Sequence, residues 1–167
     1  NESSSISNDS SLQLTTDLTI NFWMYPTEAV GGCGIITKGP GVGTTDYDYM
    51  AYLSTDSTTI NFYKKDASDT AQSLGAWIGP DGTFLNKWTN ICFTFSGNDG
   101  IGYENGVSKN TKTDFNLGIR TSNERLHVGG GWSSYYKGKI SMAQIYNKAL
   151  SAEEVQQNYN TVKWRFE

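Results

Sequence analysis

The segment LTINFWMY, residues 18–25, decides the fold, because apolar side chains recur at every second position along it. Such a period of two indicates a β-strand with one face turned into a hydrophobic core. Pro26 marks the end of the run, since proline cannot donate a hydrogen bond to a sheet ladder. The face expected to enter the core carries Leu18, Ile20, Phe22 and Met24.

A second segment, WTNICFTFS at 88–96, has the same period and places Ile91, Phe93 and Phe95 on one face. Turn signals such as Asn105-Gly106 separate these strands from shorter ones. The shorter strands are expected at 34–38, 48–54, 59–65, 101–106, 125–129 and 139–146. Many short strands at regular spacing predict an all-β protein, a two-sheet antiparallel β-sandwich or jelly roll.

The two ends of the chain differ from this pattern. Residues 1–11 are rich in Ser and Asn and predict either a frayed lead-in or a first edge strand. Near the other end, Ser151 and Glu154 have the spacing of a capping box, which predicts one short helix ending near Asn160. No internal repeat interrupts the chain, so residues 1–167 are expected to form one domain.

Charge and composition exclude several function classes. The net charge is −4 and the basic residues are scattered, which argues against binding to nucleic acid. No apolar run approaches the roughly 18 residues of a membrane helix, so no membrane insertion is expected. Cys33 and Cys92 leave two alternatives open, a disulfide or two buried thiols.

Several segments, taken in order, resemble the laminin-G-like, concanavalin A-like lectin/glucanase domains. They are LTTDLTINFWMYP (14–26), IITKG (35–39), LNKWTNICFTFSG (85–97), GYENG (102–106), LHVGGG (126–131) and YYKGKISMAQIYNKALSAEEV (135–155). The segment 150–166 also resembles the endings of marine phage and environmental structural proteins. The resemblance implies a jelly-roll module of a larger protein, outside the cell or on a virion surface, with neighbouring domains as partners.

Catalysis is not expected. Glycoside hydrolases that the chain resembles carry a Glu-x-Asp-x-x-Glu strand, which supplies two carboxylates beside the scissile bond. None of the seven glutamates here has Asp two residues later. The alginate lyases of this fold use a Gln-x-His strand, and the one histidine, His127, lacks that glutamine. We therefore interpret the chain as non-enzymatic.

Calcium is a candidate cofactor, because similar domains often hold it through carboxylate and carbonyl oxygens. Candidate ligands are Asp46, Asp48 and Asp99. Many relatives have a Gly-x-Ile-Asp strand near the end that contributes a ligand, and Ser141 stands in place of that Asp. Solvated loop polarity is the alternative explanation for Asp46 and Asp48.

Two sets of side chains are candidates for contact with a sugar, because flat aromatic rings and a few polar groups typically line such sites. One set lies on strand faces and comprises Asn21, Trp23, Asn90 and Tyr63. The other is expected on loops, where recognition residues concentrate, and comprises Tyr47, Tyr49, Trp77, Trp132, Tyr135 and Tyr136. For Trp132 and Tyr136 the alternative is a lid over the sandwich edge, where burial alone stabilises the rings.

Together these observations predict a non-catalytic module that recognises a glycan or a glycoprotein. Two alternatives come from other classes. One is a structural or assembly domain of a viral particle, and the other is a polysaccharide-degrading enzyme.

Overall fold

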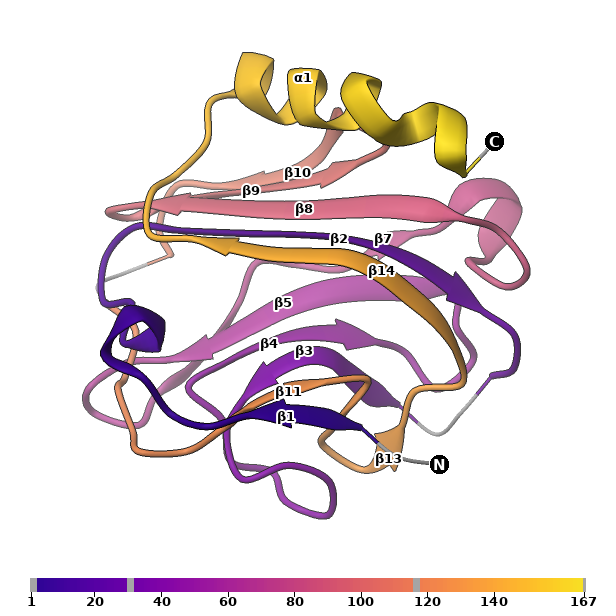
Figure 1. The fold of residues 1–167 in the computed structure, drawn as a ribbon. Helices are drawn as coiled ribbons and strands as arrows, with labels where there is room; N and C mark the ends of the chain where they lie inside the picture. Colours follow the sequence, from indigo (N-terminus) through magenta and orange to yellow (C-terminus); the bar gives the residue numbers. More distant parts are fainter. Residues whose placement is uncertain (1–2, 30–31, 116–117, 167) are drawn as a thin grey trace.

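The computed structural model describes residues 3–29, 32–115 and 118–166, and two antiparallel sheets lie face to face in it (Figure 1). Among these residues, one sheet has the order β1 (Ser4–Ile6), β11 (Leu126–Val128), β3 (Cys33–Lys38), β4 (Tyr49–Leu53), β5 (Thr59–Lys65) and β6 (Ala71–Ser73), with β7 (Trp77–Ile78) also paired to β5. The five-stranded sheet has the order β10 (Val107–Lys112), β9 (Asp99–Glu104), β8 (Thr89–Ser96), β2 (Leu18–Pro26) and β14 (Gly138–Tyr146). The predicted all-β sandwich is confirmed.

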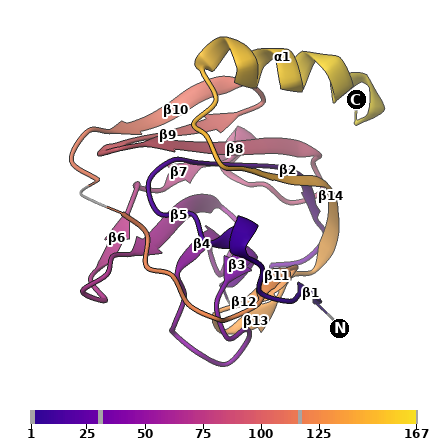
Figure 2. The same ribbon diagram turned by 60° about the vertical axis from the view of Figure 1, so that its left-hand side comes forward.

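Smaller elements complete the fold. The two-residue strands β12 (Gly130–Gly131) and β13 (Ser134–Tyr135) form a hairpin that packs beside β3 (Figure 2). The helix α1 (Ala152–Val162) lies over the outer face of the five-stranded sheet (Figure 1). Short 3-10 turns are η1 (Ser10–Leu12), η2 (Pro80–Gly82) and η3 (Lys163–Arg165).

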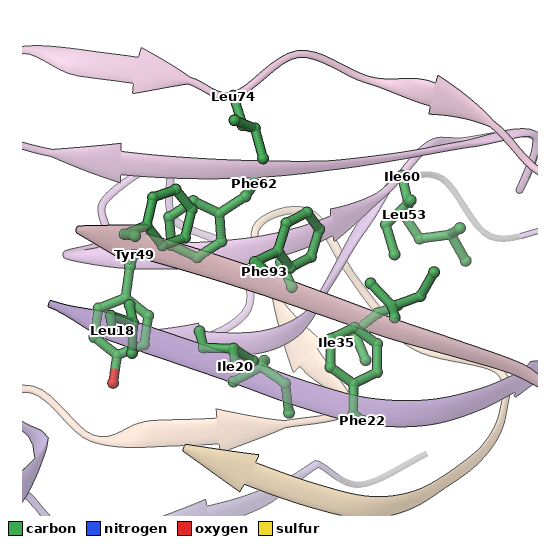
Figure 3. Close-up of a cluster of buried hydrophobic side chains, with 14 of the residues drawn as sticks. Leu18, Ile20, Phe22, Ile35, Tyr49, Leu53, Ile60, Phe62, Leu74 and Phe93 are labelled. Carbon is green, nitrogen blue, oxygen red and sulfur yellow. The ribbon is translucent and has the colours of Figure 1, made fainter. Parts of the chain in front are cut away.

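The space between the sheets is filled by the side chains that the period of two assigns to it. Leu18, Ile20 and Phe22 are fully buried on β2, as predicted. The facing sheet contributes Phe62, whose ring centroid lies 4.3 Å from that of Phe95 (Figure 3 shows the cluster). Because burial of one large apolar side chain stabilises a fold by about 1.5–3 kcal/mol, this layer supplies most of the driving force for folding.

The outer face of β2 and β8 is covered by the C-terminal helix, so the prediction of a sugar-binding face there is wrong. The Trp23 ring stacks on Phe166 at 4.1 Å and on Tyr159 at 5.7 Å. Asn90 Nδ2 donates to Asn21 Oδ1 at 2.9 Å, and both side chains are buried. These polar groups satisfy one another beneath α1 and present nothing to a ligand.

The helix begins as the capping box predicts. The Ser151 hydroxyl accepts from the Glu154 N–H, and the Glu154 carboxylate accepts from the Ser151 N–H at 2.9 Å. Two bonds thereby satisfy backbone donors that a helix start leaves unpaired. The helix continues past Asn160 to Val162. At the other end, Ser4–Ile6 pairs with β11, which confirms the edge strand and excludes a frayed lead-in there.

Both cysteines are free and buried, which settles the alternative in favour of two thiols. Cys33 lies in the core between the sheets, whereas Cys92 points outward on β8 into a cluster with Val155 of α1. Burial raises the pKa of the Cys33 thiol to about 12, so it remains protonated at neutral pH.

None of the helices in the described ranges combines the length and apolar character needed to cross a membrane.

Candidate functional site

Four aromatic rings enclose a hollow on the outer face of the larger sheet. Strand alternation turns Met50 and Tyr52 of β4 and Tyr63 of β5 away from the core. Tyr47 reaches the same place from the segment before β4, and Trp132 reaches it from the β12–β13 turn. These five side chains line a volume of about 150 Å³. We call this group the aromatic cage.

The rings of the cage follow one another around a closed circuit. Centroid distances are 6.4 Å from Tyr47 to Tyr63, 5.7 Å from Tyr63 to Tyr52, 6.3 Å from Tyr52 to Trp132 and 5.8 Å from Trp132 to Tyr47. Successive ring planes meet at 56° to 86°. The plane of each ring is therefore steeply inclined to the plane of the next ring in the circuit.

Trp132 is held in an unusual backbone conformation. Its φ of 62° lies in the left-handed region, which costs a residue with a side chain about 1–3 kcal/mol and persists only where the surroundings enforce it. Backbone bridges to Cys33 and Val42 enforce it here, and the Gly43 N–H donates to the Trp132 carbonyl at 2.7 Å. The ring is thus fixed in place over the sheet. Strain of this kind concentrates at binding sites.

The glycines before Trp132 are required by this close packing. A side chain at Gly131 would collide with Thr37 on β3, and its φ of 152° disfavours other residues. Gly32 has a similar role, because any side chain there would meet the Tyr52 ring. These positions explain why aromatic residues follow a glycine-rich loop: the loop lets the hairpin approach the sheet closely enough to complete the cage.

A second hollow adjoins the cage and has a more polar lining. It has a volume of about 250 Å³ and is bounded by Gly43, Thr44, Thr45, Trp132 and Ser133. Trp132 lines both hollows. One flat ring beside hydroxyl groups is the combination by which proteins position a ligand that has both apolar and polar surface.

Asp46 and Asp48 lie in an ion-pair network and do not fit a calcium site. Arg120 donates to Asp48 Oδ1 through Nε at 3.0 Å and to Asp46 Oδ1 through Nη2 at 2.8 Å. Lys65 Nζ also donates to Asp46, at 3.0 Å. Burial opposes ionisation of Asp46, but hydrogen bonds from Lys65 and Arg120 outweigh it and hold the pKa of its carboxyl below the usual value.

Asp99 lies elsewhere, on an exposed hairpin of the five-stranded sheet, and adds no ligand to that network. Across the described ranges, no group of three or more His, Cys, Asp and Glu side chains is arranged to hold a metal ion. Asp46 and Asp48, two of the three carboxylates that the sequence suggests for calcium, therefore have protein cations as their partners.

Two of the predicted ligand-binding rings belong to the core, which corrects the expectation for both. Trp77 is 8% exposed on β7, where its ring packs against Phe93 and its indole N–H donates to Glu104 Oε2 at 3.1 Å. Tyr49 is 1% exposed and faces inward on β4. Neither side chain is accessible to a ligand.

The remaining predicted rings divide between the cage and its surroundings. Tyr47 and Trp132 are in the cage, together with Tyr63, which the sequence grouped with another face. Tyr136 packs against the margin of the core, and Tyr135 is exposed and lines neither hollow. Tyr52 was not predicted, although its alternation with Met50 in YMAYL placed it opposite the core-facing side chains.

Comparisons with known proteins agree with this architecture. A family model described as the concanavalin A-like lectin/glucanases superfamily matches residues 1–156. Among solved structures, the binding domain of Paraclostridial Mosquitocidal Protein 1 is similar with a TM-score of 0.75 and 16% identity, covering 94% of this chain and 40% of that one. The botulinum neurotoxin serotype G binding domain is similar with a TM-score of 0.73 and 17% identity, with the same coverage. The chain thus spans about two fifths of these structures. No match was found among curated proteins.

Proposed function

Because the chain belongs to the concanavalin A-like lectin/glucanases superfamily, we propose that it is a non-catalytic module that recognises a glycan or glycoprotein through the aromatic cage and the adjoining hollow. The observation that carries the proposal is the Trp132 ring, which lines both hollows on a strained and tightly bonded backbone. The proposal places the module outside the cell, as part of a larger protein.

The chemistry of the surface supports this function. The C–H faces of a sugar ring stack on flat aromatic groups, and its hydroxyls need hydrogen-bonding partners nearby. The Trp132 ring supplies the first requirement, and Thr44, Thr45 and Ser133 beside it supply the second. Aromatic side chains have few rotatable bonds, so they make large contacts at a low cost in conformational entropy.

The similar solved structures give independent support for a binding role. Those structures are described as binding domains of toxins. In this chain α1 packs on the outer face of the five-stranded sheet, so we assign recognition to the face of the larger sheet that carries the cage.

A glycan array tests the proposal directly. The wild-type protein is expected to bind a subset of oligosaccharides, and Trp132→Ala is expected to weaken that binding at least tenfold with its thermal unfolding still cooperative. Tyr135→Ala is the matched control on the same hairpin, since Tyr135 is exposed and lies outside both hollows. It should bind as the wild type does.

Two results would overturn glycan recognition at this face. One is the absence of any oligosaccharide binding at millimolar concentration. The other is an equal loss of affinity in Trp132→Ala and Tyr135→Ala. If light scattering then showed concentration-dependent self-association lost in Trp132→Ala, the assembly alternative would replace the proposal.

A further inference from the structure

We propose that the aromatic cage takes a quaternary ammonium group, such as the trimethylammonium head of a choline substituent. The inference rests on the proposed function in that it takes this face as the recognition face, and it names the chemistry of the group that enters the cage. The ligand would then place this cationic group among the four rings and its polar part over the adjoining hollow.

The arrangement of the rings fits a cation that has no N–H groups. A ring face attracts a cation because its quadrupole is negative there. A square with sides of about 6 Å has its centre about 4.3 Å from each corner, well within the roughly 6 Å reach of this attraction. The four distances between neighbouring centroids, 5.7 to 6.4 Å, match the side length of such a figure. One central charge would therefore contact all four rings.

The size and lining of the cage restrict what enters it. A volume of about 150 Å³ suits a compact group, since a cavity of that size holds a molecule such as benzene. The lining consists of four rings and the Met50 thioether, with no carboxylate among them. A primary ammonium would lose strong hydrogen bonds to water on entering, whereas a quaternary ammonium has none to lose.

The charges around the cage do not oppose a cationic guest. Lys65 Nζ lies 5.5 Å from the centroid of the Tyr47 ring. That ammonium is paired with Asp46 at 3.0 Å and with Asp69 at 3.2 Å, so its charge is compensated. Arg120 donates to the Tyr47 carbonyl at 3.0 Å, and its guanidinium is paired with Asp48 at 3.0 Å.

The walls themselves remain neutral at physiological pH. Burial raises the pKa of the Tyr47 phenol and outweighs the opposing charge of Lys65, and burial likewise raises the pKa of the Tyr52 phenol. Neutral rings keep the negative quadrupole of their faces. A cation is thus favoured over an anion of the same size.

Titration with two small probes tests the cage without any glycan. The probes are choline and its neutral carbon analogue, 3,3-dimethyl-1-butanol. Binding of each is measured by calorimetry and by changes in the NMR chemical shifts of the Trp132 indole. Choline is expected to bind at least tenfold more tightly than the neutral analogue, with sodium chloride at equal ionic strength as the blank. Equal affinities for the two probes would overturn the inference. So would the absence of choline binding at a choline concentration of about 50 mM.

A pair of tryptophan variants locates the binding. Trp132→Ala removes one wall and is expected to weaken choline binding about tenfold or more, whereas Trp132→Phe keeps a ring and should retain part of the affinity. Trp164→Ala is the matched control, because Trp164 is 66% exposed on η3 and the nearby Phe166 stacks on Trp23 of the opposite sheet. A loss in Trp164→Ala equal to that in Trp132→Ala would contradict a site in the cage.

The outcomes separate this inference from the proposed function. If choline binds and no glycan does, glycan recognition fails and the cage assignment stands. If a glycan binds through Trp132 and choline does not, the cage assignment fails and glycan recognition stands.

Discussion

The substitution Asp48→Asn should destabilise the protein strongly, because Asp48 is the buried anion of the ion-pair network. Its carboxylate is 2% exposed and accepts from Arg120 Nε at 3.0 Å, from the Ser122 N–H at 3.0 Å and from the Ser122 hydroxyl at 2.7 Å. Lys38 Nζ, on a side chain with no exposed surface, lies 3.6 Å away. An amide keeps the volume but removes the charge that compensates Lys38.

The magnitude follows from leaving a buried cation without its partner. Breaking one side of such a pair costs about 3–5 kcal/mol. For a chain of this length, each kcal/mol lowers the unfolding temperature by about 2–4 °C, so a decrease of roughly 6–20 °C is expected. Urea and thermal unfolding followed by circular dichroism would measure it.

Two further variants make this reasoning refutable. Asp69→Asn is the control. The Asp69 carboxylate also contacts Arg120, and in addition Lys65, but its side chain is 62% exposed. Loss of this exposed charge should lower stability by less than about 1 kcal/mol. Adding Lys38→Met to Asp48→Asn should recover stability, since a buried charge is replaced by an apolar side chain of similar length. Equal effects of the two Asp variants, or no recovery with Lys38→Met, would refute the argument.

Three other predictions address separate parts of the molecule. Trp77→Phe should cost about 2–4 kcal/mol, from lost packing and the lost indole hydrogen bond to Glu104, and should leave ligand affinity unchanged in the folded protein; a changed affinity at full stability would show that Trp77 contacts ligand. Ser151→Ala should lower stability by about 1 kcal/mol in urea unfolding while α1 persists, and a loss of the helical signal would contradict this. Hydrogen bonds from Ser54 and Thr58 hold the pKa of Asp56 at about 2, below its ordinary 3.8, so its contribution to stability is present above pH 3.8 and is lost as pH falls toward 2. An NMR titration should show that midpoint and its rise in Ser54→Ala, and an unmoved midpoint would count against these bonds.

Local sequence was sufficient to predict the strands that are buried on both faces or alternate clearly. The segment 18–25 forms β2, which continues to Pro26, and 59–65 forms β5 with the expected bounds. Apolar side chains alternate throughout the first segment, whereas in the second the alternation is limited to Ile60 and Phe62. The strands that the sequence did not reveal, β6, β7, β10, β12 and β13, are short or polar. Their pairing partners, rather than their composition, make them extended.

The candidate site was only partly predictable, because burial of an aromatic side chain depends on distant partners. Trp77 and Trp132 both follow glycine-containing segments, yet one is covered by Glu104 and its strand, and the other is held at the surface by Val42. Similarly, the sequence around Asp48 suggests a carboxylate that is available to a metal ion. Its partner Arg120 lies 72 residues further along the chain. No local pattern contains these contacts.

The separate origin of the cage walls has a consequence for how its specificity is altered. Three walls belong to β4, β5 and the segment before β4, whereas Trp132 comes from a hairpin with its own two-residue ladder. Exchange of the turn between β12 and β13 would therefore replace one wall and part of the neighbouring hollow without touching the interior layer. The hairpin is the natural place to diversify in a library that seeks new ligands on this scaffold.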